Sequence, residues 1–318
     1  MFPRTLPALL CFVPLTFTAF AETKDETFID PDAAGPDFAT QGEYVGDNCA
    51  AQVVALGEGK FHIVGWSKGL PGAVENFEKK VEVDAHRDGD KVLFDGSGWK
   101  GQIDSGQLRG TNDEGRVFEL RRTLRESPTL GAKPPAGAVV LFDGTSADAW
   151  QNGHVDERKL LQAGTKSKQA FGDCTLHVEF RTPFKPAARG QGRGNSGVYV
   201  QDRYECQVLD SFGLKGEDNE AGGIYHTSKP KLNMCFPPLS WQTYDIDFEA
   251  AKFDADGKKT KNAVLTVKLN GVLVQDHVEA PQPTPGAGLK ETATPGPIQL
   301  QGHGNPVFYR NVWVVEKK

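Results

Sequence analysis

Two polar side chains stand two positions apart in a run of residues that otherwise has the composition of a β-strand. The segment GNSGVYVQDRYECQVLD at 194–210 contains Glu205 and Gln207, with Cys206 between them. Side chains alternate between the faces of a strand, so Glu205 and Gln207 share one face and Cys206 points to the other. Tyr199 joins the polar face if the preceding strand pairs in matching register. This face is either the floor of a ligand-binding groove or the solvated side of an ordinary strand.

A second candidate for proton transfer is His303. It lies between Gly302 and Gly304, which shield it little, and the ordinary pKa of histidine suits proton transfer near neutral pH. A surface histidine without a function has the same pattern. Asn195 and Ser196 either form a turn or present an amide and a hydroxyl to the hydroxyls of a sugar.

Several catalytic signatures are missing from the sequence. It has no G-x-S-x-G elbow, no H-E-x-x-H pair and no phosphate-binding loop. A conventional glycosidase needs two Asp or Glu side chains at a set separation. Asp210 could partner Glu205, but on a regular strand a residue five positions away faces the other side. A conventional endo-glucanase that uses these two carboxylates is therefore an alternative and not the first choice.

Short strands are predicted to carry these residues. From 42 to 125, alternating runs separated by glycine turns indicate a small β-meander or barrel-like domain. A proline-containing linker follows at 126–138. Residues 139–318 contain many further strand-like runs, and Asn270-Gly271 between two of them is a strong hairpin signal. Because no amphipathic helix of several turns is evident, the chain is predicted to be all-β, and its larger domain a β-sandwich.

The N-terminal residues have the features of a targeting segment. Arg4, an apolar run and a small-x-small site ending at Ala21 predict a signal peptide over 1–21, and hence a periplasmic or secreted protein. Residues 22–41 are predicted to form a flexible leader. Without Arg4, the 36 basic residues become 35 against 42 acidic ones, a net charge of −7, which argues against nucleic acid or anionic membranes as partners. No later run is apolar enough to span a bilayer, and the sequence identifies no protein partner.

Six segments occur in an order that resembles the 3-keto-disaccharide hydrolase domain family. They are FGDCTLHVEFR, GRGNSGVYVQDRYECQVLDSFG, GGIYH, PPLSWQTYDIDF, VKLNGVLV and GPIQLQGHGNPVFYRNVWV. The resemblance covers 139–318 and not the first domain. It implies a concanavalin-like lectin/glucanase sandwich, which is a jelly roll, and an exported bacterial hydrolase or lyase that acts on 3-keto sugars.

The matching family positions imply the candidate site residues. The substrate-binding candidates are Asn195, Ser196, Gln207, Asp210, Tyr225 and Gln301, and the catalytic candidates are His303 and Glu205. The chain departs from the family pattern at its cysteines, because many relatives have a cysteine at the position of Ala221 and here one stands at 206 instead. The resemblance therefore implies a relocated disulfide, Cys206–Cys235, which requires the two Cα atoms to lie within about 7 Å.

A keto sugar changes what a catalytic site must contain. A ketone at C3 acidifies the hydrogen on C2, so one base can remove it, the substituent on C1 leaves by β-elimination, and water adds back. This route needs a base, a group that polarises the ketone and an acid for the leaving group, and not two opposed carboxylates. A divalent cation could polarise the ketone, but no ligand set is evident and no other cofactor is implied. A lectin-like module that binds carbohydrate without turnover is a further alternative, because this fold also contains lectins.

Overall fold

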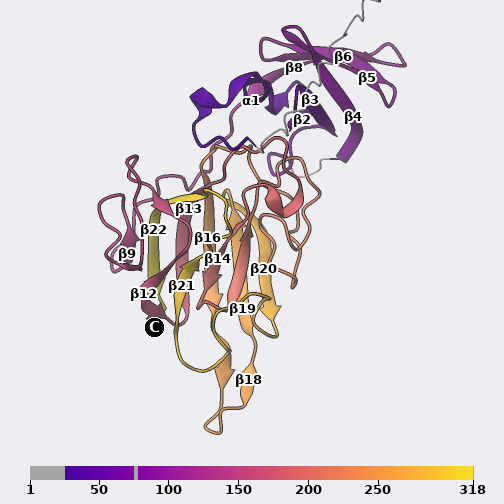
Figure 1. Ribbon diagram of the computed structural model, residues 1–318. Helices are drawn as coiled ribbons and strands as arrows, with labels where there is room; N and C mark the ends of the chain where they lie inside the picture. Colours follow the sequence, from indigo (N-terminus) through magenta and orange to yellow (C-terminus); the bar gives the residue numbers. More distant parts are fainter. Residues whose placement is uncertain (1–25, 75–77, 318) are drawn as a thin grey trace, which may run out of the picture.

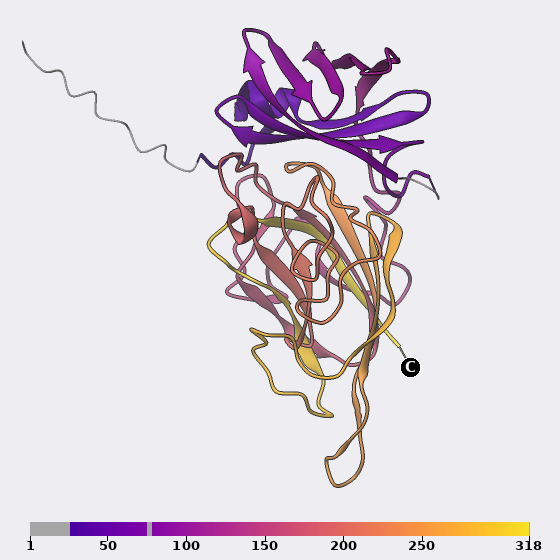
Figure 2. The same ribbon diagram turned by 90° about the vertical axis from the view of Figure 1, so that its right-hand side faces the viewer.

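The computed structural model describes residues 26–74 and 78–317 and shows an all-β protein, as predicted. A closed eight-stranded barrel lies against one end of a two-sheet sandwich (Figure 1). Figure 2, turned by 90°, shows the same arrangement, with the hairpin of β17 (Lys252–Phe253) and β18 (Lys259–Lys261) extending from the other end. Within the described residues, no helix is long and apolar enough to cross a bilayer. The predicted signal peptide at 1–21 lies outside the described residues.

The N-terminal barrel is a meander in which each strand pairs with the next and the last closes on the first. Its inward face is apolar, with Val53, Phe61 and Leu120 buried, because successive side chains alternate between the lumen and the outside. The elements up to the end of the barrel are η1 (Pro31–Ala33), α1 (Gly35–Thr40), β1 (Gly42–Val45), β2 (Cys49–Gly57), β3 (Lys60–Ser67), β4 (Glu78–Asp88), β5 (Lys91–Gly96), β6 (Trp99–Asp104), β7 (Gln107–Asn112) and β8 (Val117–Thr123).

The described residues before the barrel, 26–41, are ordered, so the flexible leader predicted for 22–41 is wrong over this part. Helix α1 forms there. Phe28 exchanges two backbone hydrogen bonds of 2.9 Å with Phe184 of the sandwich, and the ring of Phe38 lies 5.4 Å from the ring of Phe184. The acidic, proline-bearing composition of the segment conceals these two phenylalanines, whose burial fixes it in place.

The C-terminal sandwich consists of two sheets of antiparallel strands that face each other. One sheet has five strands in the order β10-β12-β21-β14-β15, and the other has seven, in the order β11-β22-β13-β16-β19-β20 with β9 beside β22. The elements are β9 (Val139–Phe142), β10 (Trp150–Gln151), β11 (Leu161–Gln162), β12 (Thr165–Phe171), β13 (Cys174–Arg181), η2 (Gly190–Gly192), β14 (Ser196–Val200), β15 (Tyr204–Val208), β16 (Gln242–Glu249), β19 (Ala263–Leu269), β20 (Val272–Ala280), β21 (Gly296–Leu300) and β22 (Phe308–Glu316).

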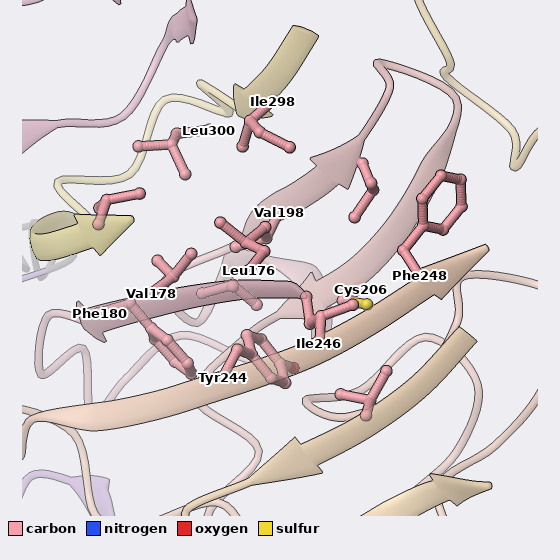
Figure 3. Close-up of a cluster of buried hydrophobic side chains, with 14 of the residues drawn as sticks. Leu176, Val178, Phe180, Val198, Cys206, Tyr244, Ile246, Phe248, Ile298 and Leu300 are labelled. Atoms are coloured by element: carbon pink, nitrogen blue, oxygen red, sulfur yellow. The ribbon is translucent and has the colours of Figure 1, made fainter. Parts of the chain in front are cut away.

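The sandwich core lies between these two sheets (Figure 3). Leu176, Val178 and Phe180 of β13 are fully buried, as their alternation predicts. Val198 of β14 and Cys206 of β15 are register partners and belong to the same core. Burial of a side chain such as Leu or Phe contributes about 1.5–3 kcal/mol, so this cluster is a major source of stability. The opposite face of β14 and β15 is left for polar residues.

The predicted Asn270-Gly271 hairpin is confirmed. Leu269 of β19 pairs with Val272 of β20, and both turn residues have positive φ, 52° and 78°, as a type I′ turn requires. A Cβ on Gly271 would lie 2.4 Å from Cγ of Pro128. Pro128, in the predicted linker, therefore packs directly on this turn.

The predicted Cys206–Cys235 disulfide is wrong, because both residues are free thiols. Cys206 fills an apolar position between the sheets. The sulfur of Cys235 instead lies 3.6 Å from the carbonyl oxygen of Leu209 and 3.4 Å from that of Phe236, and Gln242 Nε2 donates to it at 3.7 Å. Polar contacts with backbone and amide groups therefore hold Cys235, while Cys206 packs as an apolar residue.

A thiol titration tests this correction. In a Cys11→Ser background, we expect about one thiol per folded chain to react with Ellman's reagent and four after unfolding in guanidinium, because all four described cysteines are free and only Cys49 is not fully buried. Only two reactive thiols in the unfolded, unreduced chain would show that the bridge exists.

Candidate functional site

Glu205 and Gln207 lie on the outer face of the five-stranded sheet, on the side away from the core. In the register of β14 with β15, Tyr199 is opposite Glu205 and Gly197 is opposite Gln207. The alternation predicted from the sequence, including the place of Tyr199, is therefore confirmed. The face is not an open wet surface, however, since Glu205 is only 2% and Gln207 only 1% exposed.

A transverse row of polar side chains crosses the same sheet. Lys166 of β12 is the register partner of Gln299 on β21, Gln299 is the partner of Tyr199, and Tyr199 is the partner of Glu205. Gln151 of β10, paired with Lys166, begins the row. Because neighbouring strands lie about 4.8 Å apart, β12 and β15 are separated by about 14 Å. A row of this length can contact more than one sugar ring.

Gly197 provides the space in which the Glu205 side chain lies. A Cβ at this position would be only 2.2 Å from Glu205 Oε1. The hydroxyl of Tyr199 donates to Glu205 Oε2 at 2.7 Å, and Gln301 Nε2 donates to the Tyr199 oxygen at 3.2 Å. Gln301 is fixed in turn by its backbone N–H, which donates to the carbonyl oxygen of Gly197 at 2.8 Å. Three predicted polar positions thus converge on one hydrogen-bonded network.

The Glu205 carboxyl has a strongly shifted pKa. Burial raises it from 4.5 to about 7, and the hydrogen bond from Tyr199 opposes this rise. Burial also raises the pKa of Tyr199, and the Glu205 charge adds to the effect, so Tyr199 stays protonated and acts as a donor. A carboxyl with a pKa near neutrality can both accept and return a proton.

The segment between β20 and β21 covers Glu205 on one side. Thr284 Oγ1 accepts a hydrogen bond from the backbone N–H of Glu205 at 3.1 Å. The Tyr199 hydroxyl lies 3.5 Å from the carbonyl oxygen of Pro285, and a Cβ on Gly286 would be 3.2 Å from the same hydroxyl. This contact explains both the burial of the carboxyl and its raised pKa.

A depression of about 450 Å³ opens farther along the row. Lys166 lines it and forms an ion pair of 2.6 Å with the buried Asp202. Gln299 lines it as well, and Gln299 Oε1 is buried without a hydrogen-bond partner among the described residues. Glu205 does not line the depression. In the row of polar side chains, Tyr199 lies between Glu205 and Gln299. The full lining is Gln151, Asn152, Gly164, Thr165, Lys166, Gln299 and Gly302.

Gln207, Asn195 and Tyr225 lie around the Glu205 network. Gln207 turns toward a loop, where its Nε2 donates to Gln191 Oε1 at 3.1 Å. Asn195 is 5% exposed, and no described residue donates to its Oδ1. Tyr225 is partly exposed, and its backbone N–H donates to the carbonyl oxygen of Glu205 at 3.0 Å. Of these, Asn195 and Tyr225 have groups left for a ligand.

Three of the predicted site residues lie outside this network. The Ser196 hydroxyl faces the core and lies 2.7 Å from the Tyr309 hydroxyl. Asp210, fully buried, accepts two hydrogen bonds from Arg193, at 2.6 and 3.1 Å. His303 is exposed in the loop after β21, and no hydrogen bond joins its ring to Glu205 in the part of the chain that the structure describes.

Lys166, Asp202 and Gln299 were not singled out by the sequence, although they line or border the depression. Lys166 is one of two lysines in a short alternating strand, TKSKQAF, and nothing in that pattern distinguishes it from a solvated position. Only the three successive strand pairings β12–β21, β21–β14 and β14–β15 bring Lys166 into line with Glu205. No group of three or more His, Cys, Asp or Glu side chains that could hold a metal ion is found among the described residues, so no ligands are assigned to a divalent cation.

The match to a known family decides the class of this domain. A family model described as the 3-keto-alpha-glucoside-1,2-lyase-like domain matches residues 137–315, which is more than half of the chain. The chain belongs to this family. The resemblance predicted over 139–318 is thereby confirmed. The 3-keto-alpha-glucoside-1,2-lyase-like domain corresponds to the sandwich and contains the Glu205 row, whereas the barrel precedes the matched residues.

One solved structure supports the fold of this 3-keto-alpha-glucoside-1,2-lyase-like domain. A protein from Parabacteroides distasonis ATCC 8503, classed as a glycosyl hydrolase, is 33% identical with a TM-score of 0.53, covering 57% of this chain and 85% of that chain. A second protein of that class from the same organism is 18% identical with a TM-score of 0.39, covering 57% of this chain and 99% of that one. No curated protein matches the chain. The sandwich is therefore a glycosyl hydrolase-like domain.

The raised pKa of Glu205 predicts a pH-dependent stability. The folded carboxyl, with a pKa of about 7, holds its proton more tightly than the unfolded one, with a pKa of 4.5. The contribution of the Glu205 carboxyl to the free energy of unfolding is therefore fully present below pH 4.5. It is lost as the pH rises through about 7, and the loss amounts to about 3 kcal/mol. We expect the difference in unfolding free energy between wild type and Glu205→Gln to fall by this amount between pH 4.5 and pH 8 in urea titrations. A difference that does not vary with pH would contradict the shift.

Proposed function

We propose that the sandwich cleaves 3-keto-glycosides by β-elimination, with Glu205 exchanging the proton on C2 of the sugar. The observation that carries the proposal is the buried Glu205 carboxyl with a pKa of about 7, on a face lined by amides and a tyrosine hydroxyl. The description of the matched family as 1,2-lyase-like supports elimination across C1 and C2.

The Glu205 carboxylate has one oxygen available for the proton. Tyr199 donates to Oε2, and no described residue donates to Oε1. Oε1 takes the proton from C2, and the electron pair moves to the ketone oxygen on C3 to form an enolate. The C1–O bond then breaks as the ketone reforms, leaving a double bond between C1 and C2, and the leaving oxygen takes up a proton. Water then adds: its hydroxyl bonds to C1, and its other proton restores the acid that protonated the leaving oxygen. Glu205, whose proton has meanwhile exchanged with solvent, protonates C2 and completes a net hydrolysis.

Other residues of the face bind and orient the sugar. Gln301 Oε1 and Asn195 Oδ1 are buried acceptors without partners among the described residues, and they suit sugar hydroxyls, which donate. Lys166 is about 14 Å from β15 by strand spacing, so it contacts the part of the substrate remote from the reacting carbons. His303 is exposed in the loop beside Gly302, and we assign it the proton for the leaving oxygen, a role that requires this loop to move toward Glu205.

Substrate access requires a movement. Because Glu205 is only 2% exposed, the sugar reaches it only when the segment at Thr284–Gly286 shifts away. This shift breaks the hydrogen bond from the Glu205 backbone to Thr284 Oγ1, the long one from Tyr199, and the bond of 2.9 Å from the Thr284 backbone N–H to the carbonyl oxygen of Arg203. Opening therefore costs free energy, which the contacts made with the bound sugar must offset.

The proposal is tested by comparing oxidised and unoxidised sugars. The purified chain is incubated with 3-keto-trehalose or 3-keto-lactose and, in parallel, with trehalose or lactose. Release of monosaccharide from the keto sugars alone supports elimination. Binding without release indicates a lectin-like carbohydrate-binding module, and cleavage of the parent sugars indicates a conventional endo-glucanase; either result contradicts the proposal.

The place of the reaction follows from the N-terminal sequence. The predicted signal peptide supports a periplasmic or secreted enzyme, released after Ala21. N-terminal sequencing of the chain recovered from the periplasm or medium of a bacterial host should then begin at Glu22. A chain that keeps Met1 and stays in the cytoplasm would contradict this location.

A further inference from the structure

A cavity of about 640 Å³ lies inside the N-terminal barrel. It is at the end of the barrel opposite α1. Helix α1 contacts the β2–β3 turn, where Asp37 Oδ2 accepts from the Gly59 backbone at 2.9 Å, whereas the cavity is lined by Asp47 and Asn48 in the β1–β2 turn. These turns are at opposite ends of β2, so one end of the barrel is closed and the other is open.

Small inward residues on one wall keep the lumen empty. Cys49 and Ala51 of β2 and Gly65 of β3 line the cavity, and Ala51 is the register partner of Gly65. A Cβ on Gly65 would lie 2.6 Å from Val81 Cγ1, so the position does not accept a larger side chain. The residues of this wall at 49, 51 and 65 therefore have small side chains or none.

Aromatic rings form the opposite wall. Phe94, Trp99 and Phe118 line the cavity, and the rings of Trp99 and Phe118 meet edge to face at 5.2 Å. The rings pack onto glycines: a Cβ on Gly101 would lie 2.7 Å from Phe94 Cζ, and one on Gly110 2.6 Å from Phe118 Cζ. The glycines thus let the rings lie close to the barrel wall and leave the centre open.

The chemistry of the cavity changes from its base to its mouth. Ile63, Leu108 and Leu120 line it and are at most 4% exposed. At the mouth, Arg116 is an exposed cation that lines the cavity, and Val117 beside it is 75% exposed. An apolar interior with a polar rim suits a molecule that has one apolar and one polar end.

We propose that the barrel binds one small amphipathic molecule, with its aromatic or aliphatic part between the ring wall and the small-residue wall and its polar end at the rim. Eight-stranded barrels are just wide enough to hold one small ligand, and the volume lies within the range of about 300–1,000 Å³ that ligand cavities span. The matched family begins at residue 137, so this site is separate from the carbohydrate-active domain and does not depend on the function proposed for it.

The test uses N-phenyl-1-naphthylamine, a neutral aromatic probe that fluoresces in apolar surroundings. We expect saturable binding of one probe per full-length chain. Ala51→Trp, which places an indole in the cavity, should weaken binding at least tenfold. Leu93→Trp, on the outward side of β5, is the matched control and should bind as wild type does. Absence of saturation, or equal affinity in all three proteins, would overturn the proposal.

A second readout leaves the lining of the cavity unchanged. Cys49 lines the cavity and is partly exposed, whereas Cys174, Cys206 and Cys235 are buried. Burial raises the pKa of the Cys49 thiol, so alkylation with monobromobimane is followed at pH 9, in a Cys11→Ser background. Saturating probe should slow the labelling of Cys49 at least fivefold. Labelling at an unchanged rate would show that the probe binds elsewhere and would contradict the proposed site.

Discussion

Replacing Glu205 by glutamine should lower kcat on a 3-keto-glycoside by about 10²–10⁴-fold, the usual contribution of a positioned acid or base. The amide keeps the shape of the side chain and can still accept the hydrogen bond from Tyr199, which in wild type is 2.7 Å long. It cannot take up the proton from C2. Initial rates on 3-keto-trehalose, with KM measured separately, give the result.

The same substitution elsewhere in the sandwich serves as the control. Glu249 lies on the other sheet and forms an exposed ion pair of 3.1 Å with Lys261, so Glu249→Gln should leave kcat unchanged. Tyr199→Phe gives a further readout. Because the Tyr199 hydrogen bond lowers the pKa of Glu205, its loss should shift the pH–rate profile upward. If Glu205→Gln keeps near-normal turnover, Glu205 is not the base.

The second large effect concerns Asp210. Asp210→Ala should reduce the free energy of unfolding by about 3–5 kcal/mol, because it leaves Arg193 as an unpaired buried charge. Asp210 is fully buried and Arg193 is 3% exposed, with 2.6 Å between Oδ2 and the guanidinium. Chemical denaturation at pH 7 measures the change.

Two further variants separate a structural role for Asp210 from substrate binding. Replacing the pair together, with Arg193→Met and Asp210→Leu, should recover most of the lost stability, since no charge is then left unpaired. An exposed ion pair serves as the control. Removing the Glu58 carboxylate, which lies 3.0 Å from Lys60 Nζ, should lower the free energy of unfolding by at most about 1 kcal/mol. If Asp210→Ala instead lost activity at unchanged stability, Asp210 would contact the substrate, as the family resemblance implies.

Strand alternation was sufficient to place one face of the site. It put Glu205 and Gln207 together, with Tyr199 beside them if the strands paired in register, and the structure confirms Tyr199 and adds Gly197 as the partner of Gln207. Alternation is a local property with a period of two, so it can be read from five residues. The same argument placed Cys206 in the core. The hairpin at Asn270-Gly271 followed from two residues for a similar reason, since few residue pairs accept positive φ.

Contacts between residues far apart in the sequence could not be predicted from strand alternation or turn residues. Glu205 is buried because residues near 284, some 80 positions later, lie over it, and this burial raises its pKa. The predicted disulfide was wrong because sharing one domain does not bring two thiols together. The described part of the leader, residues 26–41, is ordered because Phe28 and Phe38 reach Phe184, far along the chain.

The most direct test of the account is the fate of the hydrogen on C2. The chain should cleave a 3-keto-glycoside in D2O to give 3-keto-glucose carrying deuterium at C2, detected by NMR at early times. Free 3-keto-glucose held in D2O without enzyme corrects for spontaneous exchange. Proton removal by Glu205 predicts enzyme-dependent deuterium at C2, lost together with turnover in Glu205→Gln. Cleavage that leaves the original hydrogen on C2 would contradict elimination.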